Sequence, residues 1–185
     1  QHMIPINRDD WKGVADLMLD SAKTVAQAGA EFAICPDNTC HQSFEFLLPL
    51  SPIPWLNIAE VVGKEASLKG FRKLGILGTQ YLMEGPVYPD ALKLFGIDCE
   101  IPAKKDRQRI NQIIFKELVN AIFTEESRLY FNEVMSKLAE QGCDAAVLGC
   151  TEIPLIVIPA DAPLPTLDST RLLAKAALNK ALEDL

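Results

Sequence analysis

The chain has 185 residues, of which 49% are hydrophobic and 23% are charged, so it is long enough to bury a core. Its formal net charge of −7 and its lack of any lysine or arginine cluster exclude the basic surface that nucleic-acid binding needs. No apolar run approaches the roughly 18 residues of a membrane span. Five cysteines without CxxC spacing predict a reducing, cytoplasmic setting and no zinc site.

Amphipathic segments and short apolar runs alternate along the chain. In chain order we expect a helix over 9–28, a strand over 31–35, a short helix over 41–48, a strand over 53–58, a helix over 59–68, a strand over 73–79, a helix ending near 96, a strand over 99–101, helices over 104–123 and 125–141, a strand over 145–149 and a helix over 169–184. Such alternation is typical of an α/β architecture in which helices flank parallel sheets.

One short pattern occurs twice in the chain. Residues 29–39 (GAEFAICPDNT) align without gaps on residues 142–152 (GCDAAVLGCTE). In each copy a helix ends at glycine, an acidic residue follows, and a short apolar strand leads into a polar tip. The tip residue is Asp37 in the first copy and Cys150 in the second. We therefore expect two pseudo-symmetric lobes whose tips face each other across a cleft that holds one small molecule.

The repeat also divides the chain. We expect a first lobe over 1–70, a second over 71–167, and a C-terminal helix over 168–185 that returns to the first lobe. Only 28 residues precede the first glycine of the repeat, whereas the second copy follows the strand over 73–79 and several further elements. By symmetry the first lobe lacks a counterpart of that strand. We expect a lobe that is shortened at its N-terminus, with a sheet completed by a partner segment or in some other way.

The two tips carry groups suited to a small carboxylate. Parallel α/β sheets bind ligands at the carboxyl ends of their strands, where both tips lie. The Cys150 thiol becomes a base only as a thiolate, which a nearby helix N-terminus favours. Backbone N–H groups at Thr151 and Glu152 can cradle an anion. The hydroxyls of Thr39 and Thr151 and the amide of Asn38 are further, uncharged donors.

Four stretches together resemble the aspartate/glutamate racemase family. They are residues 37–41 (DNTCH), 77–83 (LGTQYLM), 125–128 (EESR) and 149–152 (GCTE). The likeness covers essentially the whole chain in the right order. It implies two similar α/β lobes with the active site between them, no cofactor and, commonly, a homodimer. Family members usually begin with a strand and a glycine-rich loop that this sequence does not contain.

The resemblance implies racemisation by two bases that flank the α-carbon of an amino acid. One base removes the proton, and the other returns a proton from the opposite face. The second-lobe cysteine of the family falls on Cys150. The first-lobe position is cysteine in symmetrical members and threonine in some, but here it is Asp37. A carboxyl group has an ordinary pKa of about 3.9 and a thiol one of about 8.5, so the pair is chemically unequal.

Several candidate site residues have two interpretations. Asp37 acts in catalysis or caps a turn. His41 donates to substrate or to Asp37, or makes a local hydrogen bond at a helix start. Glu152 positions or deprotonates Cys150, or accepts backbone hydrogen bonds. Thr79 binds ligand or ends its strand.

Other side chains near the tips also have alternatives. Cys35 substitutes as the thiol or packs in the core. Arg128 and Lys116 are candidate partners for the side-chain carboxylate of an acidic substrate, because aspartate racemases of the family use basic residues there.

These observations predict an isomerase that racemises aspartate or a related acidic or small amino acid without a cofactor. Its partner is a small amino acid or carboxylate. One alternative is a single-cysteine decarboxylase or cis-trans isomerase of a dicarboxylate, because only one thiol stands at a tip. The other is a non-catalytic relative that binds a small carboxylate or a partner chain.

Overall fold

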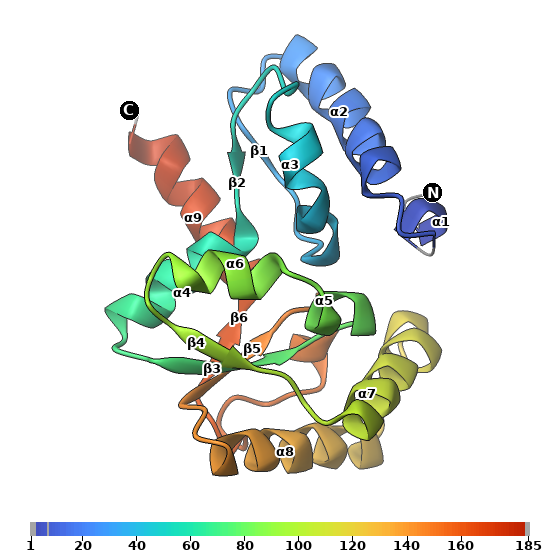
Figure 1. The fold of residues 1–185 in the computed structure, drawn as a ribbon, viewed down its shortest axis with the longest axis vertical. Coiled ribbons are helices and arrows are strands. Elements are labelled where there is room, and N and C mark those ends of the chain that lie inside the picture. The colour runs from blue at the N-terminus through green and yellow to red at the C-terminus, as the bar shows by residue number, and fades with distance from the viewer. Residues whose placement is uncertain (1–2, 7, 184–185) are drawn as a thin grey trace.

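Two parallel sheets and their covering helices build the molecule, and the computed structural model describes residues 3–6 and 8–183 (Figure 1). The helices are α1 (Met3–Ile6), α2 (Trp11–Gln27), α3 (Phe44–Leu47), α4 (Ile58–Leu68), α5 (Gln80–Glu84), α6 (Val87–Lys93), α7 (Lys104–Lys116), α8 (Glu125–Glu140) and α9 (Ser169–Glu183). The strands are β1 (Ala33–Ile34), β2 (Trp55–Leu56), β3 (Lys73–Leu77), β4 (Asp98–Glu100), β5 (Ala145–Leu148) and β6 (Thr166–Asp168), and the 3-10 turns are η1 (Thr39–Ser43), η2 (Leu118–Asn120) and η3 (Ile153–Leu155). The predicted α/β fold with parallel sheets flanked by helices is confirmed.

The larger sheet has the strand order β4-β3-β5-β6, with every neighbouring pair parallel. All four residues of β5 are buried, which is typical of a parallel strand covered on both faces. Helices α7 and α8 pack on one face with Ile110, Ile113 and Phe131, while α4 and α6 pack on the other with Val62 and Leu92. Figure 1 shows this sheet between the two helical layers.

Two predicted helices differ from the structure. The helix expected to end near 96 is two helices, α5 and α6, separated at Gly85 and Pro86, since a proline lacks the N–H that would continue the first helix. The helix expected over 104–123 leaves α-helical geometry after Lys116 and continues as the turn η2. That turn closes at Ala121, which has a left-handed φ of 57°.

The repeat predicted from the sequence has the same strand pairing in both copies. Ala33 of β1 lies opposite Trp55 of β2 in a parallel pair. The equivalent Ala146 of β5 lies opposite Thr166 of β6, again in a parallel pair. The copies therefore share their geometry as well as their residue pattern.

The helix that precedes each copy also ends in the same way. Gly29 and Gly142 have left-handed φ values of 95° and 88°. The N–H of the residue after each glycine donates back to the carbonyl five residues earlier, Ala30 to Val25 and Cys143 to Leu138. This is the Schellman helix end, which glycine favours because it has no side chain to clash in that conformation.

The helices that follow the paired strands β2 and β6 cross between the two sheets. Helix α4 follows β2 of the small sheet, but Ala59, Val62 and Ala66 bury its apolar face on the large sheet. Helix α9 follows β6 of the large sheet, packs along α4 and contacts β2. Near the far end of α9, Lys180 Nζ lies 5.7 Å from the ring centroid of Phe32. The expected boundaries after residues 70 and 167 stay a prediction.

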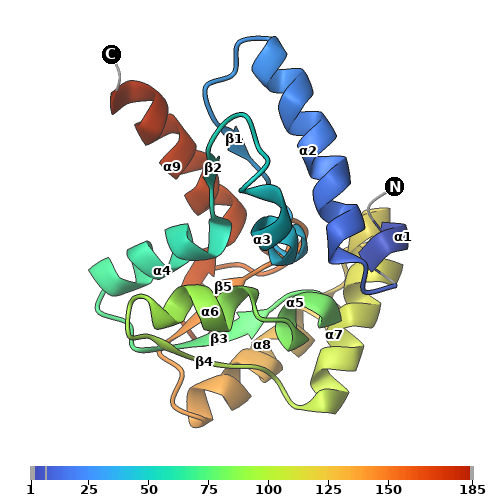
Figure 2. The ribbon, with the colours of Figure 1, turned by 45° about the horizontal axis from the view of Figure 1, so that its top comes forward.

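The small sheet is narrow. Within the described part of the chain β1 pairs only with β2. Helices α2 and α3 lie on one side of it and α9 on the other (Figures 1 and 2), and Ala15, Leu19, Phe44 and Leu47 form its core. The described residues include no helix with the length and apolar character of a membrane span.

Candidate active site

A cavity of about 460 Å³ lies at the carboxyl ends of strands from both sheets. Its lining includes Asp37, Asn38 and Thr39 after β1, Thr79 after β3, and Cys150, Thr151 and Glu152 after β5. The structure thus brings seven of the eight predicted site residues to one cavity. His41 is the exception.

Asp37 both lines the cavity and caps a turn. Its Oδ1 accepts hydrogen bonds from the backbone N–H groups of Thr39, at 2.8 Å, and Cys40, at 3.3 Å. These contacts satisfy donors at the start of η1. The capping contact proposed as an alternative is therefore present, and it holds the carboxyl group at the edge of the cavity.

Cys150 donates from Sγ to Glu152 Oε2 at 2.9 Å, and Thr151 Oγ1 donates to the same oxygen at 2.7 Å. Burial raises the pKa of the Cys150 thiol, and the Glu152 hydrogen bond and the charges of Glu152 and Asp37 raise it further. Burial also acts to raise the pKa of Glu152, but the donors Cys150 and Thr151 outweigh it and leave that pKa lowered. A protonated thiol thus faces a carboxylate.

The glycine before this cysteine is required by close packing. Gly149 N–H donates to the Leu77 carbonyl at 2.7 Å, and a Cβ on Gly149 would stand 2.8 Å from that oxygen. Any larger residue would push apart the ends of β3 and β5. The hydrogen bond and close packing of Gly149 therefore fix the backbone position of Cys150.

Two threonine hydroxyls join the first tip to the large sheet. Thr39 Oγ1 and Thr79 Oγ1 are 3.1 Å apart, and Thr79 Oγ1 also accepts from the Leu82 N–H at 3.3 Å as the N-cap of α5. Thr79 thus ends its strand, caps the next helix and lines the cavity at once.

A buried series of hydrogen bonds connects the loop after β1 to the end of β5. Tyr88 Oη donates to Asn38 Oδ1 at 2.7 Å, and Asn38 Nδ2 donates to Ser169 Oγ at 3.0 Å. Ser169 Oγ in turn donates to the Leu148 carbonyl at 2.9 Å, at the end of β5. Each of the three side chains is at most 2% exposed. These hydrogen bonds connect Asn38, the residue after Asp37, to β5, the strand that precedes Cys150.

Tyr88 and Ser169 are functional candidates that the sequence reasoning missed. The available signal was the apolar setting of Tyr88 in α6, because a tyrosine hydroxyl buried among apolar side chains needs a hydrogen-bond partner. That signal indicates that the Tyr88 hydroxyl has a hydrogen-bond partner, but it does not indicate that the partner is Asn38.

His41 lies outside the cavity lining. Its Nδ1 is 3.0 Å from the Asp37 carbonyl oxygen, and its Nε2 is 3.1 Å from the Ile58 nitrogen. A carbonyl accepts and an amide donates, so Nδ1 carries the proton and the ring is neutral. Burial lowers the pKa of His41 to about 4. His41 therefore positions the backbone of Asp37 against the start of α4.

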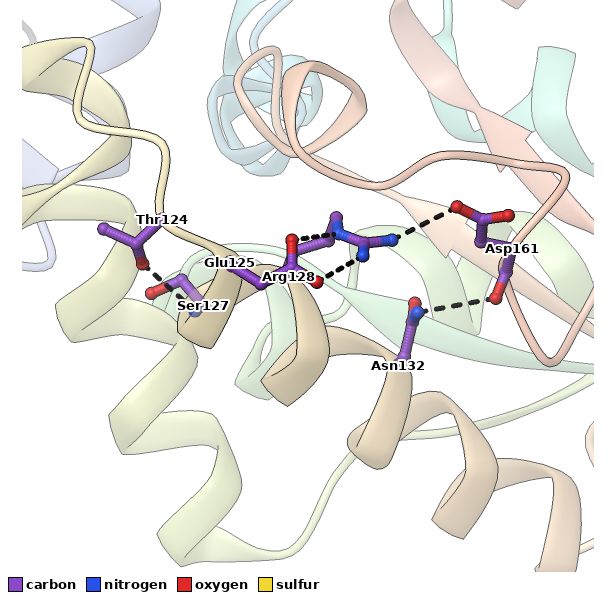
Figure 3. A network of polar contacts seen from close by, with 6 residues as sticks. All are labelled: Thr124, Glu125, Ser127, Arg128, Asn132 and Asp161. Carbon is purple, nitrogen blue, oxygen red and sulfur yellow. Dashed lines mark hydrogen bonds and ion pairs between the residues drawn. The ribbon is translucent and has the colours of Figure 1, made fainter.

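The remaining candidates are also away from the cavity. Cys35 Sγ donates to the Asp37 carbonyl at 3.7 Å but is not among the lining residues. Arg128 is held by Glu125 and by Asp161, whose Oδ2 is 3.2 Å from Nη1 (Figure 3). Lys116 is exposed at the end of α7. The cavity lining, as far as the structure describes it, contains no lysine, arginine or histidine.

No described group of three or more His, Cys, Asp and Glu side chains has an arrangement suited to a metal ion. The expected absence of a cofactor stays a prediction.

Residues 3–177 match the family model described as Asp/Glu/Hydantoin racemase. The chain belongs to this racemase family. Among curated proteins it is 25% identical over 179 residues to the broad specificity amino-acid racemase RacX of Bacillus subtilis, covering 96% of this chain and 75% of that protein. Racemases are isomerases, so the predicted enzyme class is confirmed.

Solved structures of racemase-family proteins share the fold of this chain. A candidate Asp/Glu racemase from Yersinia pestis superposes with a TM-score of 0.89 at 35% identity, covering 98% of this chain and 79% of that one. PH1733, an aspartate racemase homologue from Pyrococcus horikoshii, gives a TM-score of 0.83 at 26% identity, covering 95% of this chain and 77% of that one. These matches favour the racemase interpretation over the decarboxylase, the cis-trans isomerase and the non-catalytic relative.

Proposed function

We propose that this protein is a cofactor-independent amino-acid racemase in which Asp37 and Cys150 exchange the Cα proton by two-base transfer. The observation that supports this most is that equivalent positions of the two repeats line one cavity. The negative charge of Asp37 also contributes to the raised pKa of Cys150, which supports an arrangement with the two groups near each other. A planar carbanion between them would have one group on each face.

The protonation of Cys150 decides which group acts as the acid and which as the base in the first turnover. Because burial raises the pKa of Cys150, the thiol holds a proton and acts as the acid. The Asp37 carboxylate takes the Cα proton from one face while Cys150 gives its proton to the other, with Glu152 accepting the thiol hydrogen bond beforehand. The enzyme is left with protonated Asp37 and thiolate Cys150. That form performs the reverse reaction or returns to the starting form by exchange with water.

The hydrogen-bond inventory supplies donors for the α-carboxylate of a substrate. The Thr39 and Thr79 hydroxyls share one hydrogen bond, so one of their two hydrogens is available. The Asn38 amide nitrogen has two hydrogens, and Ser169 accepts one. The Thr151 hydroxyl can turn from Glu152 to the same carboxylate. Whether the substrate side chain is acidic, as the resemblance implies, depends on the charges of the remaining wall.

Hydrogen–deuterium exchange at Cα in deuterated water tests the mechanism. We expect exchange in the wild-type protein and a loss of about 100-fold or more in Cys150→Ala, the scale of an acid or base contribution. Cys35→Ala removes a neighbouring thiol outside the cavity and should retain exchange. Unchanged exchange in Cys150→Ala would exclude this mechanism.

Asp37→Asn separates catalysis from capping. Asparagine still offers Oδ1 to the Thr39 and Cys40 N–H groups, so the helix start keeps its cap. We expect the midpoint of thermal unfolding to stay close to that of the wild type, while exchange falls about 100-fold because the amide is no base. Exchange that persists in a folded Asp37→Asn protein would reduce Asp37 to a structural residue.

A further inference from the structure

The cavity wall beyond the two tips is mostly apolar. Ile6 comes from α1, Ile114 and Phe115 from α7, and Val119 from the turn η2. Figure 2 shows α1 beside α7. Ile6 and Ile114 are buried, whereas Val119 is 51% exposed, so the wall runs from the interior to the rim. Tyr81 adds an aromatic ring to this lining.

Of the Asp, Glu, Lys, Arg and His side chains, the described lining of the cavity contains only acidic ones. Asp37 and Glu152 both line it, and the pKa of Glu152 is lowered. Arg128, the basic residue expected to receive a substrate carboxylate, is engaged by Glu125 and Asp161 on α8 and the loop after η3 (Figure 3). The described lining provides no cation in its place. The formal charge of the whole chain, −7, adds to the negative field.

A neutral amino acid suits this environment better than a dicarboxylic one. Its ammonium group is attracted to the two carboxylates, and its α-carboxylate meets the hydroxyl and amide donors of the tips. A second carboxylate on the side chain would instead lie against an apolar wall whose described residues provide no counter-ion, and burying an unpaired charge is costly.

We infer that, within the racemase activity proposed above, the side-chain subsite formed by Ile6, Ile114, Phe115 and Val119 takes neutral, apolar side chains and rejects aspartate and glutamate. Leucine, methionine and phenylalanine represent the favoured class. This differs from the acidic substrate that the family resemblance implies.

A panel of free amino acids tests the inference through two readouts. Cα exchange should be at least about tenfold faster for leucine or methionine than for aspartate or glutamate, equivalent to about 1.4 kcal/mol. In parallel, millimolar leucine should raise the midpoint of thermal unfolding, whereas aspartate at the same concentration should not.

The rim of the wall allows a charge to be added without disturbing the core. Val119→Arg places a cation beside the subsite, and it should raise the aspartate-to-leucine exchange ratio at least about tenfold. Ile122→Arg is the matched control, because Ile122 is 48% exposed and does not line the cavity. It should leave the ratio unchanged. The aspartate-induced shift of thermal unfolding should appear in Val119→Arg only.

The outcomes separate the two proposals. Wild-type exchange or thermal stabilisation that is as strong with aspartate or glutamate as with leucine overturns the apolar subsite and leaves the racemase proposal standing. A preference for lysine also overturns it, because the two carboxylates would then recognise a side-chain cation. Stabilisation by leucine without exchange of any substrate supports the subsite and overturns the racemase proposal. Absence of both exchange and stabilisation across the panel overturns both.

Discussion

Asp37 and Cys150 are the two site residues that the repeat in the sequence identified most directly. Both line the cavity because they occupy equivalent positions of the two repeats, each shortly after a short parallel strand. The sequence offered Glu152 as a partner of Cys150 but left a second interpretation open, in which Glu152 accepts backbone hydrogen bonds. Glu152 lies two positions after Cys150, and only the folded turn decides that its carboxylate accepts from the thiol.

Glu152→Gln should make Cys150 more acidic. The hydrogen bond and the charge of Glu152 both raise the pKa of the Cys150 thiol. Removing the negative charge stabilises the thiolate, so its pKa falls. Iodoacetamide labelling of the Cys150 peptide, followed by mass spectrometry across pH, should reach its half-maximal rate at a lower pH than in the wild type. Labelling of the Cys99 peptide serves as the internal control, and an unchanged Cys150 profile would contradict the prediction.

His41 should make stability depend on pH. Its pKa is about 4 when folded, below its ordinary value of 6.5, so the unfolded chain binds the extra proton between these values. The free energy of unfolding is then highest above pH 6.5 and falls by about 3 kcal/mol as the pH decreases toward 4.

Urea unfolding at pH 7 and pH 4.5 measures this dependence. His41→Gln lacks the titrating ring, so its free energy of unfolding should change less between the two pH values. The other histidine, His2, is present in both proteins and cancels in the comparison. Equal pH dependence of the two proteins would rule out His41 as the source.

At the scale of elements, the N-terminus of α9 contacts residues of the candidate site from outside the cavity. Ser169 accepts from Asn38 and donates to the Leu148 carbonyl. Ser169→Ala leaves both groups without this partner, which should cost about 1–3 kcal/mol of stability. It should also lower kcat about tenfold with little change in KM, because the Asp37 and Cys150 tips lose their alignment.

The next residue of the same helix provides a control. Thr170 Oγ1 is buried and has no hydrogen-bond partner among the described residues. Thr170→Val preserves the shape and removes an unsatisfied hydroxyl, so stability should stay equal or increase, and kcat should not change. An equal loss of kcat in both variants would show that Ser169 does not act through its hydroxyl.

The sequence predicted the type and order of most elements because the hydrophobic period and the glycine helix ends are local signals. It did not predict the break at Gly85 and Pro86 or the end of α7 at Lys116. In the second case the apolar period continues into Leu118 and Val119, while the backbone turns and brings Val119 to the cavity. The Tyr88–Asn38–Ser169 chain was unpredictable for another reason, since its members are far apart in sequence.

At the scale of the whole molecule, α4 and α9 should make the two sheets unfold together. Val62 of α4 is completely buried in the core of the large sheet, whereas both tryptophans, Trp11 and Trp55, belong to the cores beside the small sheet. Val62→Ala should cost about 2 kcal/mol. The loss should appear equally in tryptophan fluorescence and in far-ultraviolet circular dichroism.

Leu68→Ala is the control for this experiment, since Leu68 lies on the same helix and is 76% exposed. It should leave both transitions in place. If Val62→Ala shifts the circular dichroism transition but not the fluorescence transition, the sheets unfold independently.

The crossing of α4 and α9 has a consequence for the independence of the two repeats. Each helix follows the edge strand of one sheet and covers part of the other, as in a pair of protomers that have exchanged a segment. A fragment that holds one repeat alone would lose the helix of the other repeat that packs on its sheet, so the two repeats should not fold stably once they are separated.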